Sequence, residues 1–166
     1  IMDEQGRHLI QLTDTETSDT TPTWHPREGL IAFASWDTVL EDGEVLYDDL
    51  YLLSETDEKG IITYSSDSFA KTAGYEVKDL VGEPHNLVRH SDMPRKAFKS
   101  LWDTVQAKGF WTGIIKNARK GGGYYWVFAT VLRSIDKNGN VKYVSIRTKP
   151  SREEIKKAQE LYATWE

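Results

Sequence analysis

Residues 110–149, FWTGIIKNARKGGGYYWVFATVLRSIDKNGNVKYVSIRTK, contain three runs rich in β-branched and aromatic residues. Runs of this kind, separated by short turns, are typical of antiparallel strands. The first turn is the glycine run at 121–123, and the second contains Asn138-Gly139, the strongest short-range signal for a hairpin. The sequence therefore predicts a three-stranded antiparallel meander that ends at Pro150.

The segment before this meander predicts two further strands and a group of short helices. The strand-like runs at 50–57 and 60–66 meet at the turn DEKG. Helical segments are predicted at 66–75, 76–84, 91–109 and, after the meander, 151–165. The order from residue 50 is then β-β-α-α-α-β-β-β-α, which indicates an α+β domain. Helices on one face of its sheet would leave a cavity between the two layers.

The helix at 91–109 has the clearest start and stop signals. Ser91 or Asp92 is expected to cap it, and Pro94 near its first position loses no hydrogen bond there. Gly109 is expected to end it. Its apolar residues recur at helical spacing and form one stripe: Phe98, Leu101, Trp102 and Val105.

The first and last helices have signals of their own. Asp67 or Ser68 is the expected cap of the helix at 66–75, and Gly74 is its expected end. The last helix opens with Ser151-x-x-Glu154, which is a capping box.

Composition excludes several classes of function. The chain has 166 residues, a net charge of −5 and a pI of about 5.4, so it lacks the basic balance of a general nucleic-acid binder. It has no cysteine, which excludes disulfides, zinc–thiolate sites and thiol catalysis and fits a reducing compartment. No apolar run approaches the roughly 20 residues that span a bilayer, and the start lacks a signal-peptide pattern. We therefore expect a cytoplasmic protein without direct membrane insertion.

The chain is predicted to have three parts. Residues 1–49 form a β-rich extension followed by the acidic connector WDTVLEDGEVLYDD, residues 50–150 form the main domain, and residues 151–166 form the C-terminal helix. The extension carries two apolar runs around a Thr-, Asp- and Pro-rich stretch, which predicts short strands joined by tight turns.

Residues 85–94, HNLVRHSDMP, are the densest group of chemically active side chains. Alone, they allow a metal site, an acid–base site, a pocket for an anion or a polar loop before a helix. His85, His90 and Asp92 are spaced so that no pair shares a helical face, and further ligands are missing, which weakens the metal interpretation. No nucleophile–base spacing, no separated pair of carboxylates and no nucleotide-binding fingerprint is present, so we expect no enzyme.

Residues 52–162 resemble a PAS domain of the bacterial aerotaxis-receptor type. Four stretches carry the resemblance, in family order and with family spacing: LLSETDEKGIITYSSDSFAKTAGY, LVGEPHNLVRHSDMPRKAFKSLW, FWTGIIKNARKGGGYYWV and VSIRTKPSREEI. The resemblance implies the PAS fold, which is a five-stranded antiparallel sheet with short helices packed on one face. It also implies a signal-transduction sensor that binds FAD.

The resemblance further implies the cofactor-binding residues. Arg89, His90 and Asp92 match the Arg-His-x-Asp positions that the family uses for flavin binding. Trp111 matches a family tryptophan near the flavin, and Asn117 matches an asparagine whose amide can address the edge of the ring. The interpretations without a ligand are a cap for Asp92, a core role for Trp111 and a turn for Asn117.

Two positions depart from the family pattern. Ser66 stands where many members have asparagine before the first helix. It is therefore also a candidate cofactor-binding residue, which keeps a hydrogen-bonding group but loses reach and one donor. Ser91 replaces the usual proline after the histidine. The change at Ser66 favours the alternative of a cofactor-free PAS dimerisation or interaction module.

The expected cofactor is FAD, and haem held by His85 or His90 is the alternative cofactor. Because the chain has no cysteine, a light-driven cysteine–flavin adduct is excluded. The module would report redox or energy state to a chemotaxis receptor or another signalling protein. It could also form a homodimer through the PAS sheet or the terminal segments.

Residues 1–36 show a second resemblance, to one blade of a TolB-type β-propeller. The stretch RHLIQLTDTETSDTTPTWHPREGLIAFAS carries it, with His25 where the repeat has serine. A single blade does not close a ring. The segment is therefore expected to be a cap on the PAS core, a fragment of a larger assembly or a chance match.

Overall fold

The computed structural model describes residues 23–24, 31–32, 38–47 and 51–165. Its contacts divide the chain into residues 1–36 and residues 37–166. In the first unit, β1 (Thr23–Trp24) pairs antiparallel with β2 (Ile31–Ala32). The other residues of the blade-like stretch lie outside the described ones, so the blade remains a prediction.

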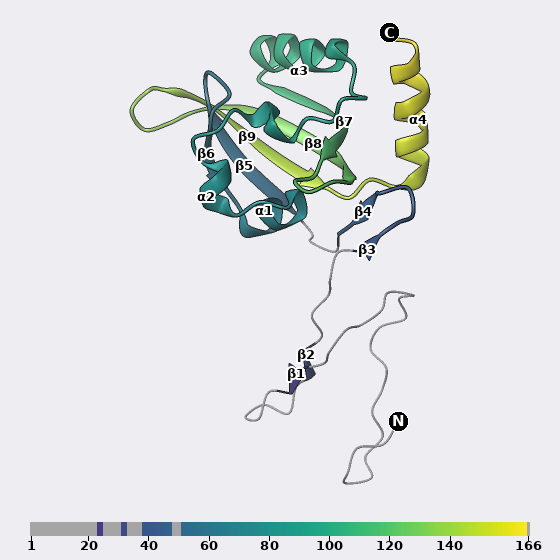
Figure 1. The fold of residues 1–166 in the computed structure, drawn as a ribbon. Helices are drawn as coiled ribbons and strands as arrows, with labels where there is room; N and C mark the ends of the chain where they lie inside the picture. The colour runs from purple at the N-terminus through teal and green to yellow at the C-terminus, as the bar shows by residue number, and fades with distance from the viewer. Residues whose placement is uncertain (1–22, 25–30, 33–37, 48–50, 166) are drawn as a thin grey trace, which may run out of the picture. The chain divides into compact units, whose positions relative to one another are not determined.

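The second unit is built on a five-stranded antiparallel sheet in the order β6-β5-β9-β8-β7 (Figure 1). Its strands are β5 (Leu52–Asp57), β6 (Ile62–Ser65), β7 (Phe110–Ala118), β8 (Tyr124–Ile135) and β9 (Val141–Thr148). The predicted meander and the predicted five-stranded sheet are confirmed. The long β8 lies between β7 and β9, which places the aromatic run of the sequence at the centre of the meander.

The turn between β8 and β9 has the predicted hairpin chemistry. The Asp136 carboxylate accepts hydrogen bonds from the backbone N–H groups of Asn138 and Asn140 at 2.8 and 2.9 Å. Gly139 takes a φ of 87°, which is the left-handed conformation that such a turn requires. This short turn fixes the register of the two strands, so Ala129 of β8 pairs with Arg147 of β9.

Helical segments lie together on one face of the sheet (Figure 1). They are α1 (Asp67–Ala73), α2 (Val77–Leu80), the 3₁₀ helix η1 (His85–Val88) and α3 (Arg95–Lys108). Between them and the sheet lies a core that includes Leu52, Phe69, Val105 and Tyr125, each 0% exposed. The order predicted from the sequence is confirmed, and η1 is an additional helical turn that was not predicted.

Two predicted helix caps are wrong. Ser66, not Asp67 or Ser68, caps α1, because its extended backbone turns its hydroxyl oxygen toward the Phe69 N–H at 3.1 Å. Pro94 precedes α3 without any side-chain cap, since the Asp92 carboxylate binds Lys116 instead. The predicted ends at Gly74 and Gly109 are confirmed, and both residues are left-handed.

The stretch predicted as an acidic connector contains a small hairpin, β3 (Thr38–Val39) and β4 (Val45–Leu46). Val45 and Tyr47 are buried, and the Tyr47 hydroxyl donates to the backbone oxygen of Trp126 at 3.1 Å. The burial of these two residues was not predicted from the sequence, because acidic residues surround the few apolar ones.

The C-terminal helix α4 (Arg152–Ala163) begins with the predicted capping box at Ser151 and Glu154. Arg152 forms an ion pair with Glu44 of the hairpin at 2.6 Å, and the Tyr162 hydroxyl donates to the Ile114 backbone oxygen on β7 at 2.5 Å. These contacts hold α4 beside the sheet (Figure 1). Within the described residues, no helix combines the length and the apolar character needed to cross a membrane.

Candidate functional site

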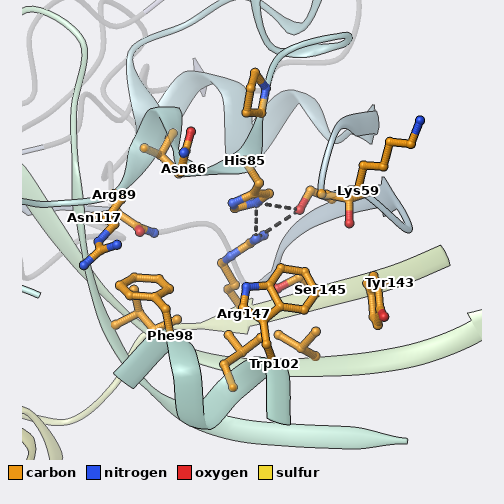
Figure 2. A pocket seen from close by; sticks show the side chains of 18 residues that line it. Lys59, His85, Asn86, Arg89, Phe98, Trp102, Asn117, Tyr143, Ser145 and Arg147 are labelled. Atoms are coloured by element: carbon orange, nitrogen blue, oxygen red, sulfur yellow. Dashed lines mark hydrogen bonds between the residues drawn. The ribbon is translucent and has the colours of Figure 1, made fainter. Parts of the chain in front are cut away.

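A cavity of about 330 Å³ lies between the sheet and the helical layer (Figure 2). The strands supply Ser54 and Thr56 from β5, Ile115 and Asn117 from β7, Val131 from β8, and Tyr143, Ser145 and Arg147 from β9. The helical layer and the loops supply Lys59, Gly60, Pro84, His85, Asn86, Val88, Arg89, Phe98, Leu101 and Trp102. The strand residues share one face because alternate side chains of a strand point the same way.

Arg147 lies at the polar centre of the cavity and is only 3% exposed. Its Nη2 donates to the Ser54 hydroxyl oxygen at 3.0 Å and to His85 Nε2 at 2.6 Å. Ser54 and His85 are also within hydrogen-bond distance of each other, at 3.1 Å, so the three side chains form a closed triangle (Figure 2). Strand β9, strand β5 and helix η1 each contribute one corner.

Phe69 of α1 forms an apolar wall behind this triangle. Its ring stacks on His85 with centroids 5.7 Å apart and planes 11° apart, and the Arg147 guanidinium lies 4.5 Å from its centroid. A buried aromatic face attracts a cation and holds an imidazole flat. Phe69 therefore fixes the orientation of both polar side chains.

His85 is neutral in this environment. Burial, and then the charge of Arg147, lower its pKa to about 3. Because a guanidinium only donates, Nε2 of His85 must be the acceptor, which leaves the proton of the neutral ring on Nδ1. The side chain thus helps to satisfy Arg147 without neutralising its charge.

The cavity carries an unbalanced positive charge. Its lining includes the side chains of Lys59, Arg89 and Arg147 but no aspartate or glutamate. Burial lowers the pKa of Arg147 to about 10, so the group remains charged near neutral pH. A buried cation without a carboxylate is costly unless another group compensates it. The lining is therefore suited to a ligand that brings negative charge or several acceptor atoms.

Arg89 and Asn117 lie together at one side of the cavity (Figure 2). Their backbones form an isolated antiparallel bridge, and the Arg89 guanidinium lies 4.2 Å from the Phe98 ring centroid. Arg89 also donates to the Met93 backbone oxygen at 3.0 Å, and Asn117 is 4% exposed. The structure thus brings two of the residues predicted to bind the cofactor to the cavity.

His90 and Asp92 do not line the cavity. The His90 ring meets the Tyr124 ring edge-on at 5.7 Å, and its Nδ1 accepts the Asp92 backbone N–H at 3.1 Å. The Asp92 carboxylate accepts from Lys116 Nζ at 2.7 Å. Both residues lie in one polar cluster beside β7.

Ser66 and Trp111 also lie away from the cavity lining. The Ser66 hydroxyl oxygen accepts from the N–H groups of Leu53 and Phe69, so it joins β5 to the start of α1. Trp111 is buried, and its ring lies over Gly113, where an added Cβ would meet it at 2.3 Å. A direct role of either side chain at a cofactor stays a prediction.

Arg147 and Ser54 were not predicted as site residues, and His85 was considered only as a metal or haem ligand. A signal for Arg147 was present in the sequence. Residues 143, 145 and 147 are alternate positions of one predicted strand, so they share a face, and that face must point to the core. An arginine on that inner face predicts a buried cation. Among the described residues, no group of three potential ligands could hold a metal ion.

The fold and the matched sequence define the class of protein. The family model for the PAS fold matches residues 62–147, so the chain belongs to the PAS family and carries a PAS sensor domain. The chain is 41% identical over 124 residues to the aerotaxis receptor of Escherichia coli strain K12, a match that covers 75% of this chain and 24% of the receptor.

It is also 26% identical over 91 residues to the nitrogen fixation regulatory protein of Klebsiella pneumoniae, covering 55% of this chain and 18% of that protein. The chain thus spans less than a quarter of either relative. The PAS domains of such receptors and regulators are signalling modules rather than enzymes.

Solved structures share the fold at low sequence identity. The PAS domain of a protein from Colwellia psychrerythraea superposes with a TM-score of 0.56 at 20% identity, covering 61% of this chain and 87% of that one. The dark structure of the blue-light photoreceptor Aureochrome1 LOV gives 0.57 at 18% identity, covering 69% and 85%. These likenesses support the fold.

Proposed function

We propose that the chain is the sensory module of a signalling protein, binds FAD in the cavity around Arg147 and reports redox or energy state. The observation that carries the proposal is the buried Arg147, which no carboxylate of the cavity lining balances. The resemblance to an aerotaxis receptor supports a flavin as the ligand.

The cavity has the chemical parts that an isoalloxazine ring needs. Phe98 and Trp102 of α3 supply aromatic surface, and Arg147 and Asn117 supply donors on the opposite, sheet side. A volume of about 330 Å³ is near the lower end of the roughly 300–1,000 Å³ usual for ligand pockets, so the ring and adjoining chain would lie inside and the nucleotide end outside. Arg89 and Lys59, at opposite sides of the cavity, are the cations that could meet phosphate there (Figure 2).

A bound flavin would supply reversible electron transfer, and the protein's own residues would detect the change. Arg147 would favour the more negatively charged state of a ligand held beside it. The Asn117 amide offers both a donor and an acceptor, so it could follow a change of protonation at the edge of the ring. Asn117 is backbone-paired with the Arg89 loop, which gives the change a path to the helical layer.

The output would pass to another protein. The relatives named above are a receptor and a regulator, which supports a chemotaxis receptor or another signalling protein as the partner and leaves a homodimer as a possible assembly. A reporting module must have two arrangements that the ligand stabilises differently. The β3–β4 hairpin and α4 are the terminal segments through which such a difference could leave the domain.

The visible absorption spectrum of the purified or FAD-reconstituted protein tests the cofactor. We expect a flavin spectrum that bleaches on reduction and one FAD per chain. A haem spectrum would contradict FAD and identify the cofactor as haem, the alternative. A colourless protein that takes up no FAD would contradict the proposal and favour the cofactor-free interaction module, to which the departure at Ser66 also points.

A further inference from the structure

Five side chains form a polar cluster outside the cavity at the edge of the sheet, and we call it the Lys116 cluster: Asp42, His90, Asp92, Lys116 and Tyr124. Lys116 is its centre. Its Nζ binds the Asp92 carboxylate at 2.7 Å and lies 4.0 Å from the Tyr124 ring centroid. Its side chain is 14% exposed, although a lysine amine normally extends into water.

Lys116 holds the turn at residues 90–93 in two ways. Its side chain binds Asp92, and its backbone N–H donates to the Met93 sulfur at 3.3 Å. The turn has internal bonds as well, from the Asp92 N–H to His90 Nδ1 and from the Met93 N–H to the His90 oxygen. One residue of β7 therefore joins this turn to the sheet through both its side chain and its backbone.

The Tyr124 ring is in turn held in place by the β3–β4 hairpin. Its hydroxyl donates to the Asp42 carboxylate at 2.7 Å, which lowers the pKa of Asp42, and its backbone N–H donates to the Gly43 oxygen at 2.9 Å. The ring then presents one face to Lys116 and an edge contact to His90. The cluster is therefore a connected set of contacts and not a chance group of surface charges.

In each of the two segments that form it, the cluster is one residue away from a residue that lines the cavity. Lys116 precedes Asn117 on β7, and His90 follows Arg89, whose backbone is extended. Neighbouring side chains of extended backbone point to opposite sides, so Asn117 and Arg89 reach the cavity while Lys116 and His90 reach the cluster. The backbone bridge between Arg89 and Asn117 joins the two segments at this point.

We propose that Lys116 is a positioning residue of the binding cavity, and that His90 and Asp92 act through it rather than by contact with the ligand. By fixing the 90–93 turn to β7, Lys116 sets where Arg89 and Asn117 present their side chains. The inference rests on the proposed flavin site for its binding readout, but its effect on the turn is independent of any ligand.

Lys116→Met tests the proposal, because it keeps much of the aliphatic stem and removes the charge. Hydrogen exchange of the Asp92 and Met93 amides in the protein without ligand should become about tenfold faster. FAD affinity should fall about tenfold. Lys116→Arg should restore most of both, since it returns a cation to Asp92 and Tyr124.

Lys120→Met is the matched control. Lys120 also pairs with a carboxylate, that of Asp79 at 3.1 Å, and also lies over a tyrosine ring, that of Tyr75 at 5.0 Å. Among the contacts of the described residues, none joins Lys120 to the 90–93 turn. Its loss should leave both readouts unchanged.

Asp92→Asn separates a positioning role from direct contact. In the native background it should weaken FAD binding, and in the Lys116→Met background it should add little. An equal loss in both backgrounds, or weaker binding by Lys116→Met with unchanged amide exchange, would overturn the proposal by showing direct contact with the ligand. Native exchange and native affinity in Lys116→Met would overturn it as well. If the native protein takes up no FAD, the proposed function fails, while the exchange comparison still decides the role of Lys116.

Discussion

His85 and His90 are five residues apart in one motif, yet they occupy opposite kinds of environment. His85 stacks on buried Phe69 and accepts a hydrogen bond from Arg147 inside the cavity. His90 meets Tyr124 and the Asp92 backbone in the Lys116 cluster at the sheet edge. The first histidine lines the cavity, and the second lies in the cluster that we propose supports it.

Residue type alone therefore does not assign a role within this motif. Residue 85 lies in η1, which turns its side chain toward the sheet, and residue 90 follows the extended Arg89. Backbone direction therefore separates residues that line the cavity from residues of the Lys116 cluster. The predictions below test this separation between the cavity triangle, Ser54–His85–Arg147, and the Lys116 cluster.

Arg147→Met is expected to have the largest effect and to act in opposite directions on binding and on stability. FAD affinity should fall by about a hundredfold or more, as expected when a buried, charge-assisted contact is lost. The free protein should unfold at the same or a higher denaturant concentration, since an unbalanced buried charge is replaced by an apolar side chain. Chemical denaturation without ligand and a FAD titration measure the two effects, and a strong loss of stability would contradict the description of Arg147 as costly to the free fold.

Acid should destabilise the protein through His85. Its folded-state pKa of about 3 is below the ordinary value of 6.5, so the unfolded state binds more protons as the pH falls from about 6.5 toward 3. The contribution of His85 to the free energy of unfolding is then fully present above pH 6.5. It is lost on acidification by at most about 1.4 kcal/mol per pH unit.

Denaturation between about pH 6.5 and pH 5 isolates this effect, because carboxylates titrate mostly below that range. His85→Leu should flatten the dependence. His90→Leu should flatten it less, because His90 is only partly buried and Asp92 opposes the lowering of its pKa. Equal slopes in the native protein and in His85→Leu would contradict a neutral His85 within the triangle.

Ser54→Ala should have a smaller effect on the same triangle. Ser54 is 1% exposed and accepts from Arg147 Nη2, so its loss removes one of the two acceptors that Nη2 has in the triangle. We expect a loss of about 1–2 kcal/mol in the free energy of unfolding, the usual cost of a missing hydrogen bond to a charged group. Ser145→Ala is a control on the neighbouring inner position of β9, and an equal cost there would argue against a special role for Ser54.

Asp92→Asn should have the smallest effect on stability. The Lys116 hydrogen bond lowers the pKa of Asp92, but the carboxylate is 62% exposed, so solvent screens the pair. The free energy of unfolding should change by less than about 1 kcal/mol. A large loss of stability measured by denaturation would mean that the cluster is a structural centre of the fold rather than a local support of the 90–93 turn.

Much of the fold could be predicted because local signals agreed with the final structure. The Asn138-Gly139 turn, the Gly74 and Gly109 helix ends and the capping box at Ser151 each act within a few residues. The capping of α1 by Ser66 was missed because several residues before the helix could serve and the backbone decided between them. The packing of Val45 and Tyr47 was missed because it depends on contacts far along the chain.

The site was less predictable than the fold. Arg89 and Asn117 were placed by family resemblance, and the structure brings them to the cavity lining. The alternation along β9 indicates that Arg147 is on the inner face of the strand, but its role as a binding residue depends on the meeting of β9, β5 and η1, which no local pattern shows. His90 and Asp92 lie in the Lys116 cluster because residues 89–93 change direction after Arg89, and a family match does not reveal a change of that kind.

A FAD titration of the native protein beside Arg147→Met and Arg133→Met tests the central claim most directly. Arg133 lies on β8 within the same sheet but does not line the cavity. We expect saturable binding of one FAD per chain, which Arg133→Met keeps and Arg147→Met loses. Native-like binding by Arg147→Met, or no binding by the native protein, would contradict a flavin site built around Arg147.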